Sequence, residues 1–184
     1  TGKFFAMEHY GVEPDLMTAA KSLAGGFPLA AVVGKAKIMD APDPGAIGGT
    51  YAGNAIACAA ALGVFDAFEA EDLLEKANKQ GEMIMKRLKA IKAKGKGMPM
   101  GDIRGLGAMC AIELVKDVAS GEPAPQLTQT LMKVANDNGL ILLSCGIYGN
   151  VIRFLVPLTA SDQIVRDGMD IFETSLTEAV TRVA

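Results

Sequence analysis

The chain contains 184 residues, half of them hydrophobic, and carries a formal net charge of -3 with an isoelectric point near 5.2. This length allows one large domain or two small ones, and the apolar half can form a core. Nucleic-acid binding is disfavoured, because phosphate neutralisation requires a basic face. One locally basic stretch, Lys86 to Lys96, is best explained as the solvated side of a helix end. No apolar run is long enough to span a membrane.

The cysteines and the single histidine limit the possible kinds of site. Cys58, Cys110 and Cys145 are widely separated, and His9 is the only histidine. No Cys/His spacing typical of a zinc site is present, and three scattered cysteines do not indicate a disulfide framework. We therefore expect no metal, no disulfide and a reducing, cytoplasmic environment.

The first third of the chain is rich in glycine and small residues. A short apolar segment from Asp15 to Ala20 ends at Lys21, and the residues Gly25 to Pro28 interrupt regular structure. The apolar run from Leu29 to Gly34 is typical of a buried strand. Two short strands around this turn indicate the interior sheet of an α/β domain.

Two helices are predicted next. Asn54 can cap a helix through its side-chain oxygen, and residues 55–70 are apolar on most sides, which predicts a buried helix. A second helix is predicted to begin near Glu71 and to end within Lys92 to Gly97, where cations and glycine are typical of a helix C-terminus. Its predicted buried stripe has members three or four positions apart: Leu74, Ala77, Gly81, Ile84, Leu88 and Ile91.

Strand-like and helix-like segments then alternate. A helix is predicted from Leu127 to Ala135, closed by Asn138 and Gly139, with strands over Leu140 to Leu143 and Val151 to Val156. After these, Thr159 and Asp162 form a capping-box pattern before a terminal helix. One face of this last helix is predicted to be apolar: Val165, Met169, Phe172, Leu176 and Val180.

This alternation of strands and helices argues for an α/β fold. We place a domain boundary near residue 70. Residues 1–70 are rich in small residues and sheet-like, whereas residues 71–184 are expected to form a compact α/β unit led by the long helix.

Lys21 is a candidate for chemistry. A lysine is usually a solvated surface residue. Here, however, it is the only charged residue between Asp15 and Lys35, and its neighbours are small and apolar. A charged amine is costly to desolvate, and an amine that gives up its proton readily is the nucleophile that Schiff-base formation needs. We therefore expect Lys21 to lie in dry surroundings and to act as a nucleophile.

The segment PDLMTAAKSLAGGFPLAAVVG, which contains Lys21, resembles the lysine segment of class III aminotransferases, which are fold-type I enzymes dependent on pyridoxal 5'-phosphate (PLP). In that family the lysine at this position forms a Schiff base with PLP and then moves a proton between substrate and cofactor. Further segments that resemble the family in the same order are FAMEHYGVEPDL, GGTYAGNAIACAAAL, DIRGLGAMCAIEL and LILLSCGIYGNVIRFLVPLT. The resemblance covers the whole chain and is strongest to the 4-aminobutyrate branch.

The resemblance implies further site residues. The threonine of the second signature, here Thr50 beside Gly49, binds the cofactor phosphate of the partner subunit in that family. A hydroxyl and backbone N–H groups just before a helix are able to hold an anion. Without the neighbouring motif, an ordinary turn residue would be the preferred interpretation of Thr50. Arg104 and Glu113 are interpreted mainly as structural residues.

Arg153 lies inside a predicted apolar strand, between Ile152 and Phe154. A buried guanidinium requires a partner, either an internal carboxylate or the carboxylate of a substrate, which a guanidinium binds with two parallel hydrogen bonds. In the family the arginine of this pattern holds the carboxylate of the amino or keto acid. The resemblance therefore favours Arg153 as a substrate-binding residue.

The fold implied by the resemblance is α/β, with the C-terminal part of the PLP-binding large domain (a mixed sheet with helices) in residues 1–70 and the small C-terminal α/β domain in residues 71–184. The implied activity is transamination of 4-aminobutyrate with 2-oxoglutarate by a cytoplasmic homodimer or dimer of dimers. Family members are more than twice as long as this chain, so we expect a C-terminal piece. The carboxylate partner of the pyridinium nitrogen and the phosphate loop would precede Thr1, and the 184 residues alone are expected to be weak or inactive.

Two alternatives remain open. One is another ω-amino acid aminotransferase of class III or a glutamate-semialdehyde-type aminomutase, which would need no keto-acid acceptor. The other is a polypeptide that folds and dimerises without catalysing a reaction.

Overall fold

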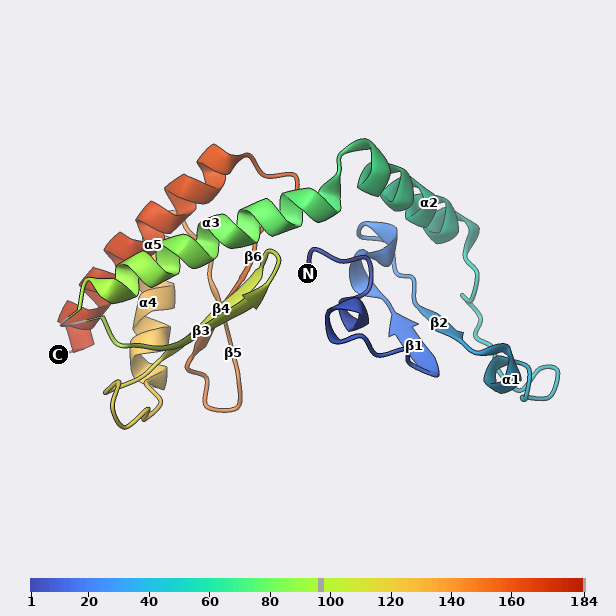
Figure 1. Ribbon diagram of the computed structural model, residues 1–184, viewed down its shortest axis with the longest axis horizontal. Coiled ribbons are helices and arrows are strands. Elements are labelled where there is room, and N and C mark those ends of the chain that lie inside the picture. The colour runs from blue at the N-terminus through green and yellow to red at the C-terminus, as the bar shows by residue number, and fades with distance from the viewer. Residues whose placement is uncertain (96–97, 184) are drawn as a thin grey trace. The chain divides into compact units, whose positions relative to one another are not determined.

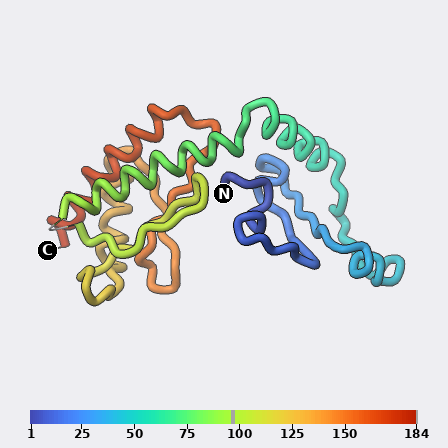
Figure 2. The backbone as a smooth tube through the Cα atoms, viewed as in Figure 1, coloured from blue at the N-terminus to red at the C-terminus, as the bar shows by residue number. Residues whose placement is uncertain are grey.

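The computed structural model describes residues 1–95 and 98–183. The chain divides into two compact units, traced in Figures 1 and 2: residues 3–73 form one, and residues 1–2 with 74–184 form the other. We refer to them as the lysine unit and the arginine unit, after Lys21 and Arg153. Each is described by itself.

The lysine unit is built on an antiparallel pair of strands, β1 (Leu16–Ala19) and β2 (Ala31–Gly34). The pair confirms the two strands predicted around the Gly-Gly-Phe-Pro turn. The remaining elements are η1 (Ala6–Tyr10), η2 (Lys21–Ala24), α1 (Ala36–Met39) and α2 (Ala55–Ala70). As predicted, Asn54 caps α2: its Oδ1 accepts from the backbone N–H groups of Ile56 and Ala57, at 3.0 and 3.1 Å.

The predicted burial of this unit is wrong. Val32 and Val33 of β2 are each 54% exposed, and in α2 Ile56 and Leu62 are 66% and 64% exposed. The reason is that two strands and one helix cannot enclose their own apolar faces, which need a further layer. An apolar residue in the sequence therefore indicates only that its face can be buried. In this unit the described residues leave the apolar faces of β2 and α2 uncovered.

The arginine unit is a four-stranded antiparallel sheet with helices packed on it. Its strand order is β3-β4-β6-β5. The strands are β3 (Met100–Leu106), β4 (Met109–Leu114), β5 (Leu143–Cys145) and β6 (Val151–Leu155), and the helices are α3 (Leu73–Ala93), α4 (Pro125–Asp137) and α5 (Asp162–Val183). The observed mixture of helices and sheets agrees with the expected α/β fold class, although both sheets are antiparallel.

The helices cover only one face of this sheet, as Figure 1 shows. Along β4, Cys110, Ile112 and Leu114 are fully buried, whereas Met109 is 44% exposed and Ala111 and Glu113 are half-buried. Because side chains alternate between the two faces of a strand, the first set points into the core and the second lies on an open face. Phe154 of β6 meets Phe172 of α5 edge to face, with ring centroids 5.2 Å apart, and links sheet to helix.

The buried stripe predicted on α3 is confirmed from Ala77 on: Ala77, Ile84, Leu88 and Ile91 are at most 1% exposed. Its predicted first member, Leu74, is only partly buried, and Leu73 is buried in its place. The helix ends at Ala93, and the backbone N–H of Gly95 donates to the Lys92 carbonyl. The rest of the predicted stop signal, residues 96 and 97, lies outside the described residues.

Two boundaries predicted in this unit are wrong. The strand expected at Leu140 to Leu143 forms instead over Leu143–Cys145, because the Leu140 N–H donates to Ala135 and keeps the chain in the helix closure. The cap of α5 is Ser161, whose hydroxyl accepts from the Ile164 N–H at 3.3 Å. Thr159 instead lies in the turn that ends at Ala160.

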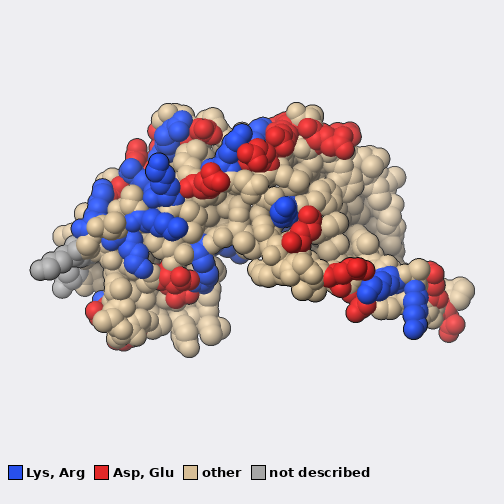
Figure 3. All heavy atoms as spheres, in the orientation of Figure 1, with Lys and Arg blue, Asp and Glu red and all other residues tan. Residues whose placement is uncertain are grey.

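Figure 3 shows charges of both signs interspersed on the face drawn, with no large patch of one sign. No helix among the described residues is long and apolar enough to cross a membrane.

Candidate active site

Lys21 follows β1 after one intervening residue, Ala20, and opens the short helix η2. Its backbone φ is +57°, and among the described residues only Asp72 shares a positive φ without being glycine. The left-handed region costs an L-residue with a side chain about 1–2 kcal/mol. Such strain persists only where the surrounding structure enforces it, and it is concentrated at functional positions. The backbone therefore distinguishes Lys21 from an ordinary surface lysine.

The side chain of Lys21 is exposed, so the expectation of dry surroundings is wrong for this chain. The two charges that flank it in sequence pair with each other, since Lys35 Nζ lies 2.7 Å from Asp15 Oδ1 at the opposite end of the strand pair. No described residue forms a hydrogen bond or ion pair with the Lys21 amine. The hairpin thus presents one free amine at the end where β1 enters η2.

Ala24 and Gly25 place the segment after Lys21 close against α2. Ala24 is 1% exposed, and a β-carbon on Gly25 would lie 3.2 Å from the Val64 side chain of α2. Gly26 has a φ of +119°, which side-chain-bearing residues rarely adopt. These small residues let η2 approach the helix closely and so fix the start of the segment that carries Lys21.

Gly49 and Thr50 lie in an exposed turn ahead of α2. The turn is closed by the Ala52 N–H, which donates to the Gly49 carbonyl at 2.9 Å. Two N–H groups at the start of α2 are already bound by the Asn54 side chain. An anion at this turn would therefore meet the Thr50 hydroxyl and the turn backbone rather than those two donors.

Arg153 occupies the middle of β6, with Ala111 of β4 and Leu143 of β5 directly opposite it. Opposite residues in an antiparallel pair share a face, and Ala111 lies on the open face. The guanidinium is half-buried, and its Nε is inaccessible to solvent and has no hydrogen-bond partner in the part of the chain described. The sequence led us to expect either an internal carboxylate or a substrate carboxylate as the partner of Arg153. Among the described residues no internal carboxylate pairs with it, so its N–H group remains available to a ligand.

A second arginine on the same face is paired. Nη1 of Arg104 lies 2.7 Å from Asp102 Oδ2 and 2.7 Å from Glu113 Oε1. Hydrogen bonds to the Asp102 carboxylate, and then to that of Glu113, raise the pKa of Arg104 further above its usual value. Both carboxylates are thus engaged by one guanidinium.

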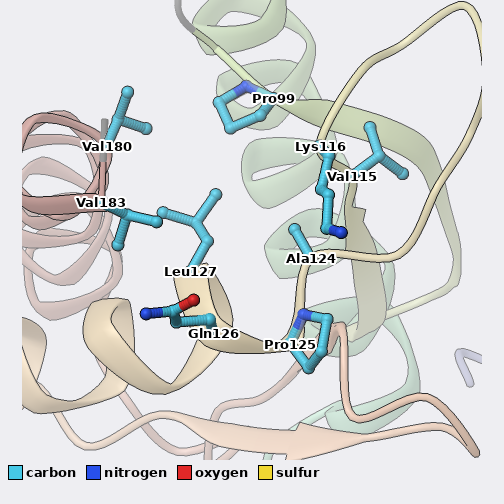
Figure 4. A pocket seen from close by; sticks show the side chains of 9 residues that line it. All are labelled: Pro99, Val115, Lys116, Ala124, Pro125, Gln126, Leu127, Val180 and Val183. Carbon is cyan, nitrogen blue, oxygen red and sulfur yellow. The ribbon is translucent and has the colours of Figure 1, made fainter.

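A hollow of about 560 Å³ elsewhere in the arginine unit does not include any of these residues (Figure 4). Val180 and Val183 of α5 and Leu127 of α4 line it. Lys116 also lines it, but its amine is 2.5 Å from Glu122. The hollow is therefore not the candidate site.

The lysine unit thus contains Lys21, Gly49 and Thr50, and the arginine unit contains Arg153. The surroundings of each residue are described within its own unit. The positive φ of Lys21 could not be predicted, because no residue pattern signals it. Arg104 and Glu113, interpreted from the sequence mainly as structural residues, lie beside Arg153 in the strand register.

Comparisons with known proteins show the family to which the chain belongs. The sequence model of the family Aminotransferase class-III matches residues 1–176. The 4-aminobutyrate aminotransferase GabT of Escherichia coli is 55% identical over 97% of this chain, and the 5-aminovalerate aminotransferase DavT of Pseudomonas putida is 52% identical over 97%. The chain spans about two fifths of the length of these relatives, 42% and 41%.

Solved structures show the same fold. A transaminase from the marine bacterium Virgibacillus superposes with a TM-score of 0.91 at 27% identity, covering all of this chain and 43% of that one. The acetylornithine aminotransferase of Elizabethkingia anophelis gives 0.82 at 31% identity, covering 97% of this chain and 44% of that one. Because the family match covers nearly the whole chain, the protein belongs to the class-III aminotransferases.

Proposed function

We propose that this protein is a PLP-dependent aminotransferase that converts 4-aminobutyrate and 2-oxoglutarate into succinate semialdehyde and glutamate. The observation that carries the proposal is the 55% identity with the Escherichia coli 4-aminobutyrate aminotransferase over 97% of the chain. The 52% identity with a 5-aminovalerate aminotransferase makes a donor one carbon longer the main alternative.

The described residues fit the chemical groups of PLP. The aldehyde requires an amine without a competing partner, and the Lys21 amine has none among the described residues. The phosphate requires hydrogen-bond donors, and the Thr50 hydroxyl is exposed in the turn just ahead of α2. When bound, PLP supplies the electron sink that stabilises a carbanion next to nitrogen.

In this proposal Lys21 would hold PLP through its amine. Once free, the amine would take a proton from the substrate carbon and pass it to the cofactor within the same half-reaction, and in the second half-reaction the proton would move in the opposite direction. A lysine can do so only while its amine is uncharged. The layer that would exclude water around it is not among the described residues, consistent with the chain spanning two fifths of its relatives' length.

Arg153 would bind the substrate carboxylate. By holding that end of the substrate, it would fix the position of the reacting carbon at the other end. Its unpartnered Nε supports this role, because a solvent-inaccessible N–H without an acceptor is costly and a carboxylate would satisfy it. Such binding orients the substrate without entering the chemistry.

We further propose a homodimer or dimer of dimers in the cytoplasm. Exposed apolar side chains on α2 and in the Thr50 turn support an assembly, since Ile56, Leu62 and Tyr51 are 66%, 64% and 83% exposed. Within it, Thr50 would bind the cofactor phosphate of the partner subunit. The three unpaired cysteines are compatible with a reducing compartment.

The test is the absorption spectrum of the purified protein with PLP. A protonated Schiff base with Lys21 is expected to give a band at roughly 410–430 nm that is absent from the Lys21→Ala variant. Lys37→Ala on α1 is the matched control and is expected to keep the band. A product assay then separates the alternatives: formation of succinate semialdehyde beyond one equivalent per active site should require 2-oxoglutarate, whereas an aminomutase needs no acceptor.

A second candidate is a chain that folds without catalysing. It is favoured by the exposure of Lys21 and by the two-fifths span relative to the relatives. Titrating the 184-residue chain with PLP decides between them: absence of the band, with folding verified by circular dichroism, would support the non-catalytic reading.

A further inference from the structure

The open face of the sheet places two arginines in one row across the strands. Arg104 of β3 is opposite Ala111 of β4, and Ala111 is opposite Arg153 of β6. Residues directly opposite one another share a face, so both arginine side chains rise from the same face of the sheet, with Ala111 between them in the row. One is paired twice, and the other has no partner among the described residues.

Glu113 is a neighbour of both arginines in the strand register. It is opposite Val151 on β6, which makes it the diagonal neighbour of Arg153 on the open face. Diagonal neighbours in an antiparallel pair lie about 7–8 Å apart, within reach of long side chains. Nevertheless, Glu113 Oε1 lies 2.7 Å from Arg104 Nη1, and Asp102 binds the same guanidinium nitrogen.

We propose that Arg104 is a positioning residue that holds the Glu113 carboxylate away from Arg153 and so keeps Arg153 free for the carboxylate of the substrate. This inference rests on the proposed function, because it assumes that Arg153 binds a carboxylate. It assigns Arg104 and Glu113 a part in substrate affinity in addition to their part in joining β3 to β4.

The physical basis is competition between two carboxylates for one guanidinium. A glutamate tethered on the neighbouring strand is always present at high effective concentration, whereas substrate arrives from solution. Released from Arg104, Glu113 would pair with Arg153 and shield it. An exposed ion pair of this kind weakens the binding of a competing carboxylate by up to about fivefold.

The first experiment compares the steady-state kinetics of the holoenzyme with those of its variants. Arg104→Gln is expected to raise the KM for 2-oxoglutarate about fivefold with a smaller change in kcat, because only carboxylate binding is affected. The double variant Arg104→Gln/Glu113→Gln is expected to return to within about twofold of the wild type. Asp102→Asn is the matched control: it removes one partner of Arg104 but leaves Glu113 held, so KM should stay unchanged.

A second readout does not require activity. The Nε–H resonance of Arg153 in the 184-residue chain is followed by NMR during titration with glutarate, a dicarboxylate probe without an amino group. Weaker glutarate binding is expected in Arg104→Gln and near-normal binding in the double variant. If Arg104→Gln does not fold, Glu113→Gln alone carries the test and should bind glutarate at least as tightly as the wild type.

The outcomes separate this inference from the proposed function. An unchanged KM in Arg104→Gln, or a raised KM that persists in the double variant, would overturn the positioning role while Arg153→Gln still weakens binding. Loss of glutarate binding in Glu113→Gln would overturn it as well. If Arg153→Gln itself leaves carboxylate binding unchanged, the assignment of Arg153 in the proposed function fails instead.

Discussion

Gly81 of α3 lies directly against Gly107 in the turn between β3 and β4: a β-carbon at position 81 would stand 1.9 Å from the Gly107 carbonyl oxygen. No real β-carbon approaches backbone that closely, so the helix and the turn touch only because residue 81 is glycine. We predict that Gly81→Ala destabilises the arginine unit by about 2–3 kcal/mol, although alanine is the better helix former by about 1 kcal/mol. Urea unfolding measures the change.

Gly168 of α5 is the matched control. It is also inside a long helix of the same unit, but a β-carbon there would meet only the Leu140 side chain, at an ordinary 3.7 Å. Gly168→Ala is therefore expected to stabilise by roughly 0.5–1 kcal/mol. Equal effects of the two substitutions would show that the contact with Gly107 is not the cause.

Gln80 joins α3 to the turn that follows β6. Its side chain is 3% exposed, and Nε2 lies 3.2, 3.5 and 3.3 Å from the carbonyl oxygens of Pro157, Leu158 and Ala160. Gln80→Glu keeps the shape but replaces the donor with a carboxylate aimed at three carbonyls. We predict a loss of about 3 kcal/mol or more at neutral pH, and of about 1–2 kcal/mol for Gln80→Leu, which adds no charge. Thermal unfolding at constant pH should rank the two variants in that order.

The elements of the arginine unit were largely predictable, because their patterns are local. The stripe from Ala77 to Ile91 and the closure of α4 at Asn138-Gly139 follow from residue spacing and helix-end chemistry, and both are confirmed. Burial in the lysine unit was not predictable. The exposure of Val32 and Ile56 depends on what lies over them, and a sequence pattern reports only that a face is apolar.

Removing Arg153 should separate stability from binding. Because its inaccessible Nε has no described partner, Arg153→Leu is expected to leave the free energy of unfolding unchanged or to raise it by up to about 1 kcal/mol. Binding of a substrate carboxylate should fall roughly 10- to 100-fold, as for a lost charged hydrogen bond. The two measurements are urea unfolding and the KM for 2-oxoglutarate.

Arg87 of α3 provides the contrast. Its Nε is also buried without a partner in the described structure, but its Nη2 pairs with Asp170 and lies 2.8 Å from Glu173. Arg87→Leu should therefore lower stability and leave KM unchanged. A loss of stability in Arg153→Leu equal to that in Arg87→Leu would argue for a purely structural Arg153.

Burial raises the pKa of the Cys110 thiol from 9.0 to about 11. Between these values the folded state keeps a proton that the unfolded state releases, so the unfolded state binds fewer protons and stability falls as pH rises. The contribution of the protonated Cys110 thiol to the free energy of unfolding is fully present below pH 9 and is lost as the pH approaches 11. We predict that between pH 8 and 10 the wild type loses roughly 1 kcal/mol more unfolding free energy than Cys110→Ala does. If the free energy of unfolding changes by the same amount in both proteins between pH 8 and pH 10, the raised pKa of Cys110 is contradicted.

The candidate site was only partly predictable from the sequence. The isolated position of Lys21 between Asp15 and Lys35 singled it out, and the apolar flanks of Arg153 did the same. The left-handed backbone of Lys21 had no signal, because backbone strain is imposed by packing rather than by residue type. The relation of Glu113 to Arg153 was hidden for a similar reason, since it depends on the register between β4 and β6.

The most direct test of the central claim is to locate the cofactor chemically. The protein is incubated with PLP, reduced with borohydride, digested and analysed by mass spectrometry. The account predicts a phosphopyridoxyl group on the peptide that contains Lys21, and its absence from the Lys21→Ala variant and from the peptide that contains Lys37. A label spread over several exposed lysines, or one that persists when Lys21 is replaced, would contradict it.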